Sequence, residues 1–82
     1  MLTILYFARL REVLGCASET LATPPATVRD LIALLVERGG VWQAELGGAR
    51  VFRVAINQEM AQLDDAIPAG AEVAIFPPVT GG

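Results

Sequence analysis

The pattern of apolar and polar positions predicts a chain of short strands interrupted by one long helix. Segments rich in β-branched and aromatic residues, several of alternating polarity, are expected to be strands: residues 2–8, 16–22, 51–57, 60–63 and 72–76. From Val28 to Val36 the apolar period changes to i, i+3, i+4, i+7 and i+8, which is typical of an amphipathic helix. Thr27 predicts its N-cap and Gly39-Gly40 its end. Short helical turns are expected at residues 9–15 and 41–46.

The order of these elements indicates the fold class. One helix lies between two strands and three later strands, so an α+β architecture of two layers is expected. A mixed sheet packed on one main helix, the β-grasp or ubiquitin-like roll, satisfies this order. A ferredoxin-like fold would need a second full helix between the late strands, and none is predicted there. We expect one β-grasp domain over residues 1–76 and a flexible C-terminal tail over residues 77–82.

Residue parity along the strands predicts two unlike faces of the sheet, because side chains alternate along a strand. The larger aliphatic set is the expected core: Ile4, Val54, Ile56, Val73 and Ile75. The opposite set has no helix to cover it: Leu5, Phe7, Ala55, Ala74 and Phe76, with Met60. Leaving this second set in water forgoes several kcal/mol at about 25 cal/mol per Å² of apolar surface. We therefore interpret the second face as a docking surface for a partner protein, with Arg11 and Arg53 at its rim.

The last six residues, PPVTGG, carry the clearest functional signal. The two prolines favour a stiff, extended base, and the two glycines leave a slim tip without side chains. From Phe76 this tail reaches roughly 20 Å, at ~3.3–3.6 Å per residue. A disordered terminus is the common alternative. The combination of prolines and terminal glycines favours a tail that delivers the carboxylate of Gly82 into the active site of another protein.

Composition narrows the partners and the compartment. The chain has 82 residues, enough for one small domain, and 54% of them are apolar. No apolar run approaches the ~18–20 residues of a membrane span, so the excess apolar surface is assigned to a protein partner and not to a membrane. The net charge is −3 and the six basic residues, all arginines, are scattered, which argues against nucleic-acid binding. A lone cysteine and no visible signal peptide predict a reducing, cytoplasmic location.

Missing residue types exclude several chemistries. Without lysine there is no Walker-type phosphate loop and no Schiff-base catalysis, and without histidine there is no Ser-His or Cys-His pair and no histidine zinc site. We therefore expect a protein that is not catalytic alone and that binds neither a metal nor a cofactor of its own. Cys16 is interpreted as a small packed residue and not as a redox site. Asp64 and Asp65 are interpreted as solvated carboxylates in a turn.

Two segments resemble the small, sulfur-carrying subunit of molybdopterin synthase. They are residues 6–15, YFARLREVLG, and residues 76–82, FPPVTGG, and the turn at residues 54–58 matches the same family. The resemblance covers essentially the whole chain, and the tail motif is specific when it is joined to the N-terminal one. The family's fold is the β-grasp, in agreement with the order of predicted elements.

The resemblance implies a sulfur carrier in molybdenum cofactor biosynthesis. An E1-like adenylating enzyme would use ATP to adenylate the carboxylate of Gly82, and sulfur transfer would convert it to a thiocarboxylate. The tail would then enter the large subunit of molybdopterin synthase and give its sulfur to cyclic pyranopterin monophosphate. The expected passage residues are Val79, Thr80 and Gly81, and the expected partner-binding residues are Phe7, Arg11, Met60 and Phe76. The assembled synthase is expected to be a heterotetramer of two small and two large subunits.

Other readings of the tail remain open on the sequence. A thiamine-pathway sulfur carrier has the same fold and the same diglycine end, although the segment around Arg11 and the Pro-Pro pair favour the molybdopterin family. A ubiquitin-like protein modifier would conjugate its tail to lysines of target proteins. A plain interaction domain with an inert tail is the third alternative, and deletion of Gly82 separates it from the others.

Overall fold

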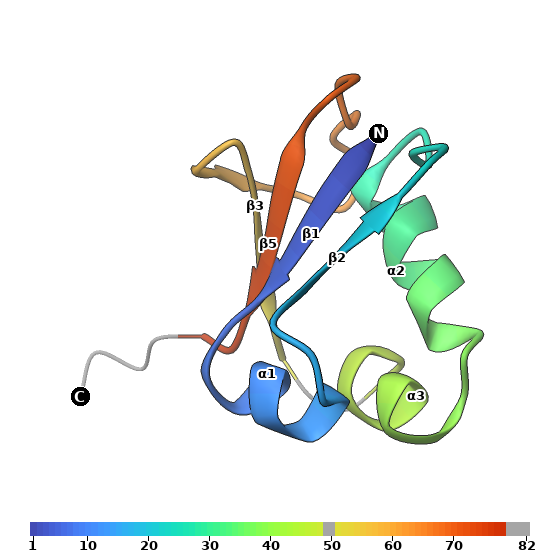
Figure 1. Cartoon of the computed structure of the whole chain (residues 1–82), viewed down its shortest axis with the longest axis vertical. Helices are drawn as coiled ribbons and strands as arrows, with labels where there is room; N and C mark the ends of the chain where they lie inside the picture. Colours follow the sequence, from blue (N-terminus) through green and yellow to red (C-terminus); the bar gives the residue numbers. More distant parts are fainter. Residues whose placement is uncertain (49–50, 79–82) are drawn as a thin grey trace.

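The computed structural model describes residues 1–48 and 51–78. Its elements follow in the order β1 (Leu2–Tyr6), α1 (Ala8–Leu14), β2 (Ser18–Leu21), α2 (Val28–Val36), α3 (Gly40–Leu46), β3 (Arg53–Ile56), β4 (Glu59–Ala61) and β5 (Glu72–Phe76). Each predicted strand and helical segment is therefore present (Figure 1). The tail predicted at residues 77–82 lies mostly outside the described residues, which end at Pro78.

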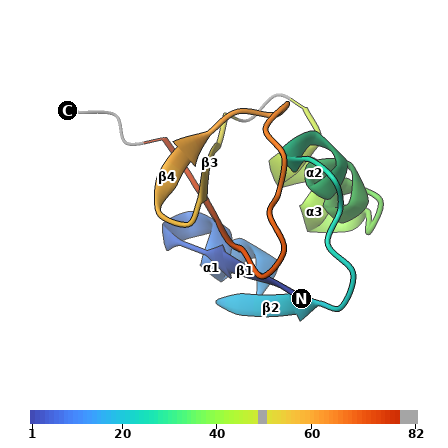
Figure 2. The same cartoon turned by 90° about the horizontal axis from the view of Figure 1, so that it is seen from above.

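The five strands form one mixed sheet in the order β2-β1-β5-β3-β4. The two central strands, β1 and β5, run parallel, and the remaining neighbours are antiparallel. Helices α2 and α3 lie on one side of the sheet, whereas α1 lies at the end where β1 finishes (Figures 1 and 2). This is the β-grasp topology, and it confirms the fold class expected from the order of the elements.

Four of the five strands are shorter than predicted because their ladders end early, whereas β5 has the predicted bounds, Glu72–Phe76. The pair Arg53↔Phe76 is the last between β3 and β5, and Pro77 beyond it has no N–H to donate. At the other end of the β3–β4 hairpin, Asn57 and Gln58 have φ of 50° and 71°, the left-handed conformation that a two-residue hairpin turn requires. After β4 the N–H of Gln62 donates to the side chain of Asp65 at 2.8 Å, which turns the chain away from the sheet.

The predicted cap of α2 is confirmed, but its predicted end is wrong. The Thr27 hydroxyl accepts a hydrogen bond from the Asp30 N–H at 3.2 Å, as expected of an N-cap. The helix stops at Val36, before the two glycines, and its C-cap residue is Glu37. Gly39 is instead the N-cap of α3, with a φ of 74°. The glycine pair therefore separates two helices, because its positive φ values start a new direction.

The core lies between the sheet and the two helices on its inner side. Its fully buried members include Leu2, Ile4, Tyr6, Val28, Leu31, Leu35, Val73 and Ile75. Four of the five predicted core residues are buried: Ile4, Val54, Val73 and Ile75. Ile56 is only half-buried, since it lies next to the exposed hairpin turn at the end of β3.

A cluster of polar and aromatic side chains connects β1 and β2 with α3 and the segment that follows α2. The Arg38 guanidinium donates to both carboxylate oxygens of Glu19, at 2.9 and 2.6 Å, and lies 4.4 Å from the centre of the Trp42 ring. Tyr6 donates its hydroxyl to Glu19 at 2.7 Å and meets Trp42 edge to face. Burial, followed by the hydrogen bond to Glu19, raises the pKa of Tyr6, and the hydrogen bond from Arg38 lowers the pKa of Glu19. Trp42 is thus a packing residue.

Candidate functional site

A row of apolar residues crosses the sheet on the face away from α2 and α3. Strand register places Leu5 beside Ala74, Ala74 beside Ala55, and Ala55 beside Met60, so the row spans β1, β5, β3 and β4. Directly opposite residues of paired strands share a face, and these four belong to the six residues predicted for the uncovered side. Met60 is 65% exposed, whereas Ala55 is buried despite lying on this face. A small side chain at the middle of a row is shielded by its longer neighbours.

Two phenylalanines stand where this row meets the base of the tail. Phe7 directly follows β1 and is 44% exposed, and Phe76 ends β5 and is half-buried. Because β1 and β5 run parallel, both strands finish at the same edge of the sheet, and the Phe7 N–H donates to the Ile75 carbonyl at 3.2 Å. The face therefore brings Phe7, Met60 and Phe76 onto one side of the sheet, with Phe7 and Phe76 at the edge from which Pro77 and Pro78 continue. We call this surface, made of Leu5, Phe7, Ala55, Met60, Ala74 and Phe76, the docking face.

Two exposed arginines lie on elements that meet the edge where β1 and β5 finish. Arg53 is the register partner of Phe76, and Arg11 lies on α1, four residues after Phe7. Both are exposed, and within the described ranges 1–48 and 51–78 neither takes part in an ion pair. By contrast, the other described arginines join separate elements of the fold: Arg9 to Glu45, Arg29 to Asp64, and Arg38 to Glu19. Arg11 and Arg53 are therefore available to a partner's carboxylates, although the chain as a whole is acidic.

The chain enters α1 through a strained residue that sequence reasoning missed. Ala8 has a φ of 53°, a left-handed conformation that costs a residue with a Cβ about 1–2 kcal/mol. Phe7, in extended conformation, precedes it as the N-cap, and its carbonyl accepts from the Leu10 N–H at 3.1 Å. The turn at Ala8 ends the extended conformation after Phe7 and directs the chain into α1. Nothing in the residue type of Ala8 signals this, because alanine ordinarily avoids the left-handed region.

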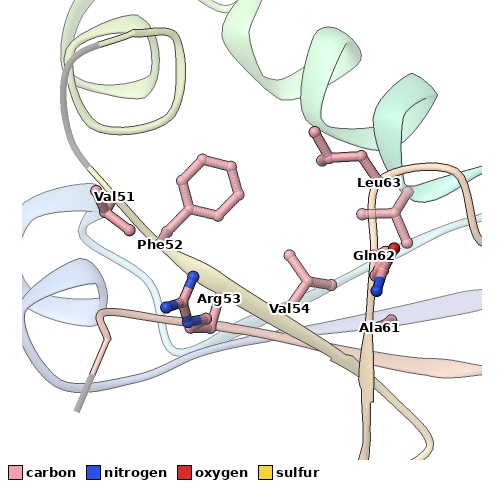
Figure 3. A pocket seen from close by; sticks show the side chains of 8 residues that line it. Val51, Phe52, Arg53, Val54, Ala61, Gln62 and Leu63 are labelled. Carbon is pink, nitrogen blue, oxygen red and sulfur yellow. The ribbon is translucent and has the colours of Figure 1, made fainter.

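A separate pocket of about 370 Å³ lies between β3 and the start of α2. Its lining residues are Val28, Val51, Phe52, Arg53, Val54, Ala61, Gln62 and Leu63. Figure 3 shows the side chains of Phe52 and Val54 directed toward α2, with Arg53 on the opposite side of the strand. No residue of β5 or of the tail base lines this pocket. It is therefore a gap between the sheet edge and the helix and is distinct from the docking face.

The remaining candidate groups have structural partners. Asp64 and Asp65 are exposed, as the sequence suggested, and each also accepts a hydrogen bond: Asp64 from Arg29 at 2.8 Å, and Asp65 from the Gln62 N–H. Cys16 is half-buried against the core, and burial raises the pKa of its thiol, which opposes a reactive thiolate. Within residues 1–48 and 51–78 no group of three or more histidine, cysteine or acidic residues gathers to hold a metal. No helix in the same ranges is long and apolar enough to cross a bilayer.

The predicted tail residues Val79, Thr80, Gly81 and Gly82 lie outside the described residues, so their roles stay predictions. What the described residues define is a ubiquitin-like β-grasp domain with an uncovered apolar face at the base of its C-terminal segment. Residues 4–82 match the model of the ThiS family, and the chain belongs to this family.

Three known proteins are similar to the chain over nearly its whole length. The molybdopterin synthase sulfur carrier subunit of Haemophilus influenzae is 39% identical over 100% of both chains. The protein of the same name from Escherichia coli is 34% identical, again over 100% of both chains. The crystal structure of small archaeal modifier protein 1 from Haloferax volcanii superposes with a TM-score of 0.77 at 32% identity, covering 95% of this chain and 97% of that one.

Proposed function

We propose that this chain is the sulfur carrier subunit of a molybdopterin synthase and acts in molybdenum cofactor biosynthesis. The observation that carries the proposal is the end-to-end match, at 39% identity, to a protein named for that role. The docking face supports it, because a carrier must dock its body while its last residues enter a partner. The described residues hold no catalytic constellation of their own, so the reactive group is assigned to the C-terminal carboxyl of Gly82.

The chemistry of the carrier follows from the weakness of a carboxylate as an electrophile. An E1-like adenylating enzyme transfers AMP from ATP to the Gly82 carboxylate, and pyrophosphate leaves. A donor that delivers hydrosulfide then attacks the acyl carbon, AMP leaves, and a thiocarboxylate remains. Its sulfur passes to cyclic pyranopterin monophosphate in the large subunit, and water restores the Gly82 carboxylate. ATP is bound by the activating partner, and Gly81 and Gly82 present no side chain that would block either approach.

The docking face gives each predicted partner residue a distinct part in this scheme. Phe7 and Phe76 supply apolar contact beside the tail base, and Met60 extends it across the sheet with a side chain that adapts to different surfaces. Arg11 supplies a charged contact at the edge. Val79, Thr80 and Gly81 pass through the entrance to the partner's active site. The assembly is proposed to be a heterotetramer of two small and two large subunits in the cytoplasm.

Intact-mass measurement tests this function. The purified chain is incubated with the adenylating enzyme of its own organism, ATP and a sulfide source. We expect a mass gain equal to the replacement of one oxygen by sulfur, absent when ATP is omitted or Gly82 is deleted. An unchanged mass with an adenylating enzyme that is active on its established carrier would contradict the proposal.

A second candidate function is that of a protein modifier, favoured by the similarity to small archaeal modifier protein 1. In that case the activated Gly82 carboxyl would form an isopeptide bond with a lysine of a target protein. Because this chain has no lysine, it would cap its targets and could not extend itself through its own side chains. A tryptic remnant of the tail on target lysines would establish this function.

A thiamine-pathway carrier is distinguished by a reconstitution assay. It would supply sulfur to a thiazole-forming reaction and not to molybdopterin formation.

A further inference from the structure

Glu45 is the one charged or polar residue that is buried within the described part of the chain. It lies on α3 and is 5% exposed, and its carboxylate accepts a two-pronged contact from Arg9 of α1, with Nη2 3.0 Å from Oε2 and Nη1 bonded to Oε1. Burying a carboxylate carries a desolvation cost of several kcal/mol, which an ion pair offsets only when its geometry is good. Replacing such a pair by apolar residues often changes stability little, whereas removing one partner leaves an uncompensated buried charge. None of the proposed sulfur chemistry uses this pair.

Helix α1, which carries Arg9, is too short to be stable without tertiary contacts. Helix α1 has seven residues, fewer than an isolated helix needs, and it starts at the left-handed Ala8. Its anchors are therefore tertiary: Leu10 and Leu14 in the core, and the bond from Arg9 to Glu45. Two buried leucines fix the distance of a short helix from the core, but they restrict its rotation about its own axis less strongly. A bidentate contact to a second helix restricts that rotation.

Helix α1 also connects α3 to the strand that leads into the tail. It contacts both α3 and β5, and Figure 1 shows it at the end of the sheet where β5 finishes. Phe7 links the two, because its N–H donates to the Ile75 carbonyl at 3.2 Å and its own carbonyl accepts from α1. The connection from Glu45 to β5 thus runs through its hydrogen bonds with Arg9, along the backbone of α1 to Phe7, and through the Phe7 N–H to Ile75.

We propose that Glu45 is a positioning residue for the docking face. Through Arg9 it holds α1 so that the left-handed turn at Ala8 keeps the Phe7 ring at the edge of the sheet, beside the tail base. The part of this inference that concerns partner binding rests on the proposed function. The part that concerns α1 does not, and it is measurable on the isolated chain.

Hydrogen exchange tests the hold on α1 directly. The variant Glu45→Gln keeps the side-chain size and removes the charge, and we expect the Leu10 and Gly15 amides, both bonded within the α1 region, to exchange about tenfold faster. The Leu31 amide of α2 should follow only the change in global stability. Val28→Ala, which removes buried volume from α2, is the control and should affect α1 no more than α2. If Glu45→Gln changes α1 and α2 equally, the residue is merely stabilising and the inference is wrong.

A double-mutant cycle tests the effect on docking. Glu45→Gln should weaken binding to the large synthase subunit about tenfold in the unaltered chain, but less than about twofold in a Phe7→Ala background, where no ring remains to be positioned. Additive effects would overturn the inference. Should Glu45→Gln fail to fold, Arg9→Met breaks the same bond from its half-exposed side and retains the apolar stem. An unaltered chain that does not bind the large subunit contradicts the proposed function, while the exchange measurement still decides whether Glu45 holds α1.

Discussion

Replacement of Phe7 by alanine tests whether the uncovered sheet face is a docking surface. A phenylalanine side chain offers on the order of 200 Å², and Phe7 is 44% exposed, so roughly 90 Å² remains for a partner to cover. At ~25 cal/mol per Å², the loss of this contact corresponds to about 2 kcal/mol, or about thirtyfold in the dissociation constant. Isothermal titration calorimetry of Phe7→Ala against the large synthase subunit measures this loss, and thermal unfolding checks that the domain remains folded.

Leu34→Ala is the matched control for this experiment. Leu34 has nearly the same exposure, 42%, but it lies on α2, at the opposite side of the sheet from the docking face. It should change the affinity by less than about twofold, as surface substitutions away from an interface do. The reasoning is refuted if Phe7→Ala binds as tightly as the unaltered chain, or if Leu34→Ala weakens binding to the same extent.

Three further substitutions test the interactions that shape the fold. Arg38 lowers the pKa of Glu19 in the folded state, so the stability from this pair is present above the ordinary glutamate pKa of 4.5 and is lost as the pH falls through the lower folded value. Glu19→Gln should therefore flatten the acid limb of a stability-against-pH curve measured by urea unfolding, and an unchanged acid limb would contradict the assignment. Thr27→Ala removes the side-chain cap of α2 and should lower the unfolding free energy by about 1 kcal/mol in the same assay. Gly15→Ala meets no atom within 4 Å, but its φ of 80° should still cost about 1–2 kcal/mol, and a neutral result would show that the turn relaxes.

The sequence predicts the elements of this domain because local chemistry and global fold agree. The apolar period of α2 and the parity of β1, β3 and β5 specify the same buried core, and the threonine cap marks where α2 begins. Where the strands end was less predictable. Those limits depend on neighbours, such as Asp65, which accepts the Gln62 N–H after β4, and not on the residues of the strand alone. The end of β5 at Phe76 is the exception, since Pro77 directly follows it in the sequence.

The docking face was partly predictable for the same reason. Parity placed Leu5, Met60 and Phe76 on the side without a helix, because the side of a strand is a local property. The division of the arginines into paired and unpaired ones was not predictable, since it depends on which carboxylates the fold brings near them. The Arg9–Glu45 contact joins residues 36 positions apart, and no short-range pattern marks it. The left-handed Ala8 was missed because its conformation is imposed by the packing of α1.

The position of β5 in the sheet has a mechanical consequence. It lies between β1 and β3 and is hydrogen-bonded to both, whereas β2 and β4 form the outer edges. Tension applied to the chain beyond Phe76 acts along β5, so its two ladders resist in shear with many bonds sharing the load. An outer strand would peel away one bond at a time. We therefore expect the domain to resist tension on the chain beyond Phe76 better than it would if an outer strand led into that segment.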